Sequence, residues 1–210
     1  MNLKNDLKLA FSPKSFSNLA QTFDFKSGLK IMLIWSLLLV VFNVAFSLIN
    51  GAINGKLLGK LFGFSLFISL AVLIVMVLSL VIVGVIGGWL SKLIFKGEGN
   101  ISKSIGAISY GIVPMFLIGV IQNLILFIDA LGANFSNTAF NWMYLILMII
   151  SLVWVAWISM EALAWANAIK KTAGFVCFIV GFIVVSLLNL FIVGWLVSLL
   201  VEIFKGIGVF

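Results

Sequence analysis

The sequence predicts an all-α integral membrane protein, a bundle of about five transmembrane helices with a short N-terminal interfacial helix. Of its 210 residues, 64% are hydrophobic and 9% are charged, whereas a soluble domain carries about 25% charged residues. Apolar runs long enough to cross a bilayer recur along the chain, and lysines gather in alternate loops. A bilayer accepts this excess of apolar surface, because it is an apolar solvent for the outside of the fold.

Residues 1–29 form a predicted cytoplasmic tail, which contains an amphipathic helix over 13–24. Ser12 can cap this helix, and Pro13 suits its first position. Apolar residues then recur at helical spacing, as Phe16, Leu19, Ala20 and Phe23. This stripe favours a short helix that lies in the membrane interface. The alternative is a disordered tail without packing partners.

Five apolar runs follow in a membrane domain over residues 30–206. A helix needs about 20 apolar residues to cross the hydrocarbon core. The predicted spans are about 31–49, 64–90, 105–131, 142–166 and 175–204. The breaks between them are rich in Gly, Asn and Lys, which favour turns and loops.

The lysines predict an orientation, because Lys and Arg near span ends favour the cytoplasmic side. The tail, the second loop and the fourth loop together carry ten lysines, and the remaining segments carry three. We therefore expect a cytoplasmic N-terminus and a C-terminus on the outside. The same lysines account for the net charge of +7. We expect anionic lipid headgroups to attract them, and therefore no nucleic-acid partner.

The composition also excludes several kinds of chemistry. The chain has no His and one Cys, Cys177, so a His-based general base, a His-containing zinc site and an internal disulfide are all excluded. The Gly97-Glu98-Gly99 sequence lacks the third glycine of a phosphate-binding loop. We expect no catalytic residues, no metal site and no cofactor, and therefore no enzyme.

Two sets of glycines are candidates for helix packing. Between the first two spans they recur at every fourth residue, as Gly51, Gly55, Gly59 and Gly63. If this segment is helical, the glycines form a strip that lets another helix approach closely; the alternative is a flexible loop. Gly84 and Gly88 form a further GxxxG motif in the second span.

Polar side chains at membrane depth are the remaining candidates. The amides are Asn43, Gln122, Asn123 and Asn189. Interhelical hydrogen bonds are their usual role, and a polar pathway is the alternative. Glu161 lies about 28 Å along the fourth span from Trp142. This distance places its carboxylate near the inner interface, where Lys103, Lys170 or Lys171 could pair with it.

The stretch after the second span resembles the Yip1 domain family. Members of that family have a Gly-x-Gly turn and then a Tyr-x-x-x-Pro element, which here correspond to Gly97, Gly99, Tyr110 and Pro114. Proline removes a backbone hydrogen bond, so we expect a kink at Pro114. Weaker similarities lie at 12–16 and 171–173, and the resemblance covers roughly residues 10–200.

The resemblance implies a five-helix bundle with a cytoplasmic N-terminus. Eukaryotic members are implicated in ER–Golgi transport, membrane shaping and the binding of small Rab GTPases. Their cytosolic N-terminal regions are usually longer, so this chain is more similar to a short-tailed prokaryotic member of the cell membrane. Small-GTPase binding and an ER or Golgi location would apply only to a eukaryotic-type chain.

The features together predict a non-enzymatic, multi-pass membrane protein. Its expected role is membrane organisation or trafficking through helix packing, with the bilayer, a second copy or other membrane proteins as partners. The alternative is a small transporter or channel that uses the intramembrane amides.

Overall fold

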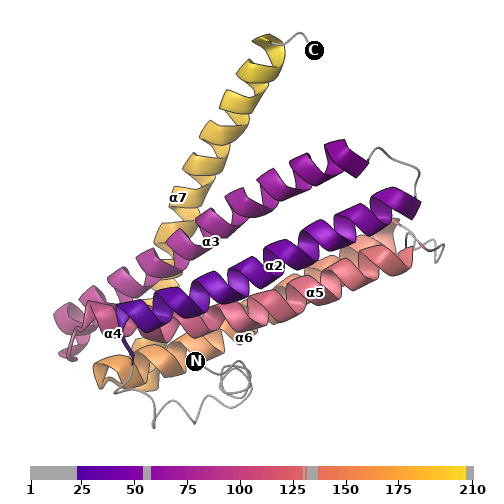
Figure 1. The fold of residues 1–210 in the computed structure, drawn as a ribbon. Coiled ribbons are helices and arrows are strands. Elements are labelled where there is room, and N and C mark those ends of the chain that lie inside the picture. The colour runs from indigo at the N-terminus through magenta and orange to yellow at the C-terminus, as the bar shows by residue number, and fades with distance from the viewer. Residues whose placement is uncertain (1–22, 54–57, 130, 132–136, 207–210) are drawn as a thin grey trace.

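The computed structural model describes residues 23–53, 58–129, 131 and 137–206, which are helical almost throughout and contain no strand (Figure 1). In chain order the elements are α2 (Phe25–Ile53), α3 (Leu58–Phe95), α4 (Ile101–Ile108), the 3-10 helix η3 (Ser109–Gly111), α5 (Ile112–Ile128), α6 (Asn137–Asn167) and α7 (Lys171–Gly206).

The predicted fold class is confirmed. Five stretches of the described chain are long and apolar enough to cross a membrane: Phe25–Ile53, Ser65–Phe95, Ile101–Ile128, Thr138–Asn167 and Lys171–Phe191. The first has 29 residues and is about 44 Å long, which exceeds a hydrocarbon core of about 30 Å. Helices of this length must tilt in the bilayer or protrude from it. Each spanning helix also begins several residues before the apolar run from which it was predicted, as α2 does at Phe25.

The predicted interfacial helix over 13–24 lies outside the described residues, apart from its last two. Phe23 and Asp24 precede α2 and are not helical. An Asp24 carboxylate oxygen accepts a hydrogen bond of 2.6 Å from the backbone N–H of Ser27. This is the geometry of an N-cap, so Asp24 sets the start of α2.

The long helices are neighbours in a ring. In contact order the ring runs α2, α3, α7, α6, α5 and back to α2. The short helix α4 contacts α2, α3 and α6, and it lies at the end of the bundle where α2 and α7 begin (Figure 1). α7 crosses α3 and leans away from α2 and α5 (Figure 1).

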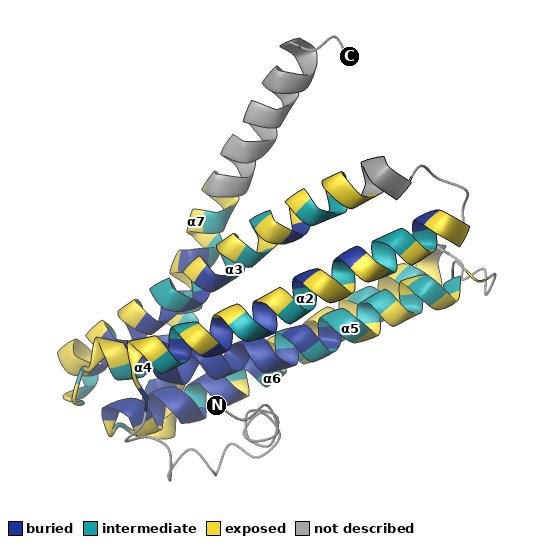
Figure 2. Cartoon of the chain, viewed as in Figure 1, coloured by how far each residue is buried: buried dark blue, intermediate teal, exposed yellow. Residues whose placement is uncertain are grey.

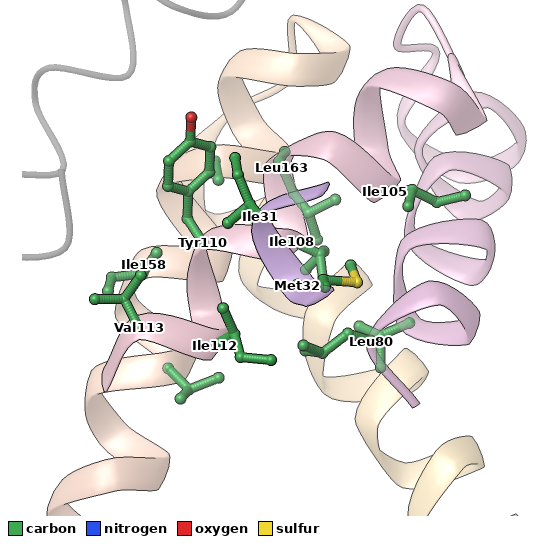
Figure 3. Packing of buried hydrophobic residues seen from close by; sticks show 14 of the residues in the cluster. Ile31, Met32, Leu80, Ile105, Ile108, Tyr110, Ile112, Val113, Ile158 and Leu163 are labelled. Atoms are coloured by element: carbon green, nitrogen blue, oxygen red, sulfur yellow. The ribbon is translucent and has the colours of Figure 1, made fainter. Parts of the chain in front are cut away.

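The best-buried part of the bundle surrounds α4 and η3 (Figure 2). Ile108 and Ile112 are fully buried there, and they pack among side chains from the neighbouring helices. Met32 comes from α2, Leu80 from α3 and Leu163 from α6 (Figure 3). Burial decreases toward the other end of α2, α3 and α6 (Figure 2).

The third predicted span is two helices joined by the tightened turn of η3. Pro114 has no N–H to donate to the carbonyl of Tyr110, four residues earlier. The backbone there adopts the tighter 3-10 pattern, in which the N–H of Ile112 donates to the carbonyl of Ser109. This 3-10 turn lies just before Pro114, and the kink expected at the proline stays a prediction.

The glycines between the first two spans do not share one helix. Gly51 is buried near the end of α2, Gly59 and Gly63 belong to α3, and Gly55 lies outside the described residues. α3 runs back alongside α2 (Figure 1), so a single helical strip over 51–63 is wrong. The polar residues and glycines of this segment favour a reversal of the chain over a continuous helix.

Candidate functional site

The candidate site begins at the turn between α3 and α4, where the two motif glycines have different roles. Gly99 adopts a φ of +65°, a left-handed conformation that favours glycine. A Cβ on Gly97 would lie 2.5 Å from a methyl group of Ile169 and 2.7 Å from the carbonyl oxygen of Asn167. The turn therefore requires glycine once for backbone conformation and once for close approach to the α6–α7 turn.

Asn100 then starts α4. Its side-chain oxygen accepts a 3.0 Å hydrogen bond from the backbone N–H of Lys103, which is the N-cap arrangement. The Lys103 ammonium also forms a 2.9 Å ion pair with Glu98 in the same turn. Because Asn100 caps the helix, residues 101–104 are helical, although they precede the predicted third span. The cap at Asn100 is a signal that sequence reasoning missed.

Asn167 connects this turn to the end of α6. Its fully buried side chain donates hydrogen bonds of 2.9 Å to the Ser104 hydroxyl and 3.1 Å to the Leu163 carbonyl. Its own carbonyl accepts a 2.9 Å bond from the N–H of Glu98. Sequence reasoning placed Asn167 in a loop; an amide at the end of an apolar run is the only local sign of this role.

Glycines allow α4 to enter between α2 and α3. A Cβ on Gly84 would lie 2.7 Å from the Cα of Ile105, and one on Gly88 would lie 2.8 Å from the Ser104 hydroxyl. On the other side, a Cβ on Gly28 would lie 2.7 Å from the Cα of Gly106. Gly84 and Gly88 thus pack within this chain, while Gly28 and Gly106 are contacts that sequence reasoning missed.

The start of α2 also docks on this region. The N–H of Phe25 donates a 2.9 Å hydrogen bond to the hydroxyl of Ser102, and the Phe23 ring lies 5.9 Å from the ring of Tyr110. Hydrogen bonding by the side chain and then the backbone of Ser27 holds the pKa of Asp24 below its usual value. We call the segment from Gly97 to Pro114, with these partners, the motif junction.

The motif junction lies within a family match that covers most of the chain. A family model described as the Yip1 domain matches residues 8–187. The chain belongs to the Yip1 domain family. No curated protein and no solved structure matches it. In this Yip1 domain all four motif positions, Gly97, Gly99, Tyr110 and Pro114, lie in the motif junction, where Tyr110 and Pro114 are buried.

The membrane-depth amides of this Yip1 domain bond at two separate helix interfaces. Asn123 donates 2.7 Å and 2.8 Å hydrogen bonds to Asn43 of α2 and to the Gly119 carbonyl. Asn189 of α7 donates a 3.1 Å bond to the hydroxyl of Ser79 in α3. The structure therefore brings Asn43 and Asn123 together and leaves Asn189 apart from them.

Gln122 lies on the wall of a cavity. Its backbone carbonyl accepts a 3.3 Å hydrogen bond from the hydroxyl of Tyr144. Its cavity, between α5 and α6, has a volume of about 450 Å³. A second cavity of about 480 Å³ lies between α3 and α7 and includes Asn189. The two cavities share Met115, Val155 and Phe182.

Glu161 is the buried acid of the described helices. Its Oε1 forms a 2.6 Å ion pair with Lys171, one of the three lysines predicted as partners. Its Oε2 is buried and has no hydrogen-bond partner among the described residues. Lys103 pairs with Glu98 instead. The pair joins the end of α6 to the start of α7.

Close packing at glycines, hydrogen bonds and an ion pair join the described residues of this site. Among them, no three His, Cys, Asp or Glu side chains lie close enough together to hold a metal ion. Within the motif junction, glycines, hydrogen bonds and the Glu98–Lys103 ion pair hold α2, α3 and α6 against α4, and the α3–α4 turn packs on the α6–α7 turn. What this arrangement can do is hold one end of the bundle in a fixed geometry.

Proposed function

We propose that this multi-pass Yip1 domain is a non-enzymatic organiser of the membrane that acts through helix packing and protein partners. The observation that carries the proposal is the use of its polar groups. Asn43, Asn123, Asn167 and Asn189 all bond to other helices, and one carboxylate oxygen of Glu161 is held by an ion pair. Groups committed to such ties favour a scaffold role over a catalytic one.

The partner surface in this proposal is the cavity between α3 and α7, defined above. Its walls are apolar, but Ser79, Ser186 and Asn189 also line it. Small and polar residues are the groups through which membrane helices associate. A transmembrane helix of a second copy or of another membrane protein would fit this surface.

Co-purification in a mild detergent tests the proposal. Val72 lines the cavity and is half exposed, so Val72→Trp should abolish the self-association or partner capture that the wild type shows. Leu78→Trp is the control, since Leu78 is equally exposed on the same helix and lies outside the cavity lining. A wild type that is monomeric and partner-free, with no membrane phenotype on deletion, would contradict the proposal.

A small transporter or channel is the second candidate. It is favoured by the two cavities that meet at Met115, Val155 and Phe182, with Gln122 on one wall and Asn189 on the other. In this case the protein in liposomes would conduct a solute or ion, and Gln122→Leu with Asn189→Leu would abolish the flux. Liposomes without any flux would remove this candidate.

We also propose that the end of the bundle with the motif junction faces the cytoplasm. The lysines with described side chains all lie at this end: Lys26, Lys30, Lys92, Lys96, Lys103, Lys170 and Lys171. The positive-inside tendency supports a cytoplasmic N-terminus and an external C-terminus, in the cell membrane of a prokaryote or in ER or Golgi membranes of a eukaryote.

A further inference from the structure

A third cavity lies at the lysine-rich end of the bundle, beside the motif junction, with which it shares Ile169. It is formed by the end of α3, the turn between α6 and α7, and the first turns of α7, and its volume is about 430 Å³. Phe95, Ile169, Lys170, Thr172 and Val176 are among its lining residues. Lys170, Thr172 and Val176 are exposed, so the cavity is accessible from outside the protein.

The exposed lining residues change from polar to apolar as α7 enters the bundle. Lys170 and Thr172 lie at the turn and in the first residues of the helix. Val176 lies one turn further along α7 than Thr172, and Phe95 adds an aromatic wall. A phospholipid has the same order of chemistry, with a polar headgroup at the surface and acyl chains toward the core.

The charge beside this cavity is positive. The α3–α4 turn packs on the α6–α7 turn, because Gly97 lies against Ile169 and the Glu98 N–H bonds to the carbonyl of Asn167. Lys170 lines the cavity, Lys96 follows its lining residue Phe95 in sequence, and neither lysine forms an ion pair with a described carboxylate. Lysines next to membrane-spanning helices attract anionic lipid headgroups, and an ammonium binds phosphate as a point charge.

We propose that this cavity is a specific site for an anionic phospholipid, whose phosphate is bound by Lys170 and Lys96 and whose glycerol and upper acyl chain lie against Phe95 and Val176. The site would fix the α6–α7 turn to the inner leaflet. This inference does not depend on the proposed scaffold function, because it concerns lipid binding alone; its inner-leaflet placement rests on the proposed orientation.

Lipid binding to the whole protein in detergent micelles tests the site, with native mass spectrometry as the readout. The probes are short-chain phosphatidylglycerol, short-chain phosphatidylcholine and inorganic phosphate. We expect one tightly bound phosphatidylglycerol, weak binding of phosphatidylcholine, and no competition by phosphate at millimolar concentration. Lys96→Gln with Lys170→Gln should weaken phosphatidylglycerol binding by at least about tenfold, given the attraction of each lysine for an anionic surface.

Two control variants make the test specific. Lys26→Gln with Lys30→Gln removes the same charge from exposed positions at the same end of the bundle and should leave the affinity unchanged. Val176→Phe should fill the cavity and weaken binding, whereas Val180→Phe, one turn further along α7, should not. Equal losses in both lysine pairs would overturn the proposal in favour of general surface charge. Full competition by phosphate would overturn it in favour of a free-anion site.

Discussion

Single glycines let α4 pack closely against its neighbours in this structure, and Gly84 is one of them. Its missing side chain lets the backbone of Ile105 approach, since a Cβ there would lie 2.7 Å from that Cα. Gly84→Ala should therefore destabilise the bundle by about 1–3 kcal/mol, the usual cost of overpacking. Thermal unfolding in detergent is the measurement.

Gly63→Ala is the matched control, because a Cβ on Gly63 would have no neighbour within 4 Å. Both substitutions replace glycine by alanine inside α3, so both gain the same helix propensity. A melting temperature for Gly84→Ala equal to that of Gly63→Ala would show that α4 does not pack against α3 as described.

The two partners of the Glu161–Lys171 ion pair differ in burial. This difference decides which substitution costs more stability. The Glu161 side chain is 7% exposed, while that of Lys171 is 57% exposed. Lys171→Ala leaves a buried carboxylate without its cation and should cost about 1–2 kcal/mol, reduced from the fully buried case by solvent around the lysine. Glu161→Gln leaves no buried charge and should cost less.

The double variant separates charge from packing. Adding Glu161→Gln to Lys171→Ala should restore part of the lost stability, because the unpaired buried charge is then absent. Lys30→Ala, at the same end of the bundle, serves as the control for loss of one exposed lysine. A double variant that is no more stable than Lys171→Ala would contradict this reading of the pair.

The cap of α2 depends on pH through Asp24. The hydrogen bonds from Ser27 lower its pKa from the ordinary value of 3.8, so the folded state favours the carboxylate. This contribution is present above pH 3.8 and is lost as pH falls through the lowered pKa. The difference in melting temperature between wild type and Asp24→Ala should therefore narrow below that pH, and a constant difference from pH 7 to pH 3 would contradict the capping role.

At the scale of the helices, the polar tie between α2 and α5 is the clearest coupling. Asn123 donates to Asn43 over 2.7 Å. Interhelical hydrogen bonds of this kind contribute about 0.6–2 kcal/mol in membranes. In a double-mutant cycle with Asn43→Leu and Asn123→Leu, unfolding in micelles should show a coupling energy in this range. A cycle of Asn43→Leu with Asn189→Leu should show none, because Asn189 bonds to Ser79 at another interface.

The helices could be predicted from the sequence wherever a local feature, such as apolar length or a proline, determines them. Apolar length fixes the number of spans, and Pro114 marks the interruption of the third. The start of α4 was predicted too late, although the Asn100 cap is local. The glycine strip over 51–63 was one of two alternatives; Gly51 and Gly63 lie on different helices, and spacing alone does not show where the chain reverses.

The motif junction could be predicted only in part, because its contacts join distant parts of the chain. Gly97, Gly99, Tyr110 and Pro114 were identified from the order of the motif. Asn167 was not, because its partner Ser104 lies 63 residues away in sequence and no local pattern encodes that distance. A buried amide is costly unless it is bonded, but burial itself is a tertiary property.

At the scale of the molecule, one labelling experiment can test two separate claims. The first is that the α3–α4 and α6–α7 turns lie on the same side of the membrane, and the second is that this side is the cytoplasm. The α3–α4 and α6–α7 turns touch through Gly97 and Ile169, so they must lie on the same side of the membrane whatever the orientation. In a Cys177→Ala background, Lys96→Cys and Lys170→Cys should both react with a membrane-impermeant maleimide only after the cells are permeabilised. Thr138→Cys, at the start of α6, should react in intact cells.

The possible failures of this experiment point to different errors. If Lys96→Cys and Lys170→Cys react from opposite sides, then the number of spans between them is wrong, and the packing of α3 on the α6–α7 turn is wrong with it. If both react in intact cells and Thr138→Cys does not, the five-span bundle stands and only its orientation is reversed. The lysine asymmetry would then have a different cause, because Lys96 and Lys170 would face the outer leaflet, and anionic lipid would have to be available there for the proposed site to bind it.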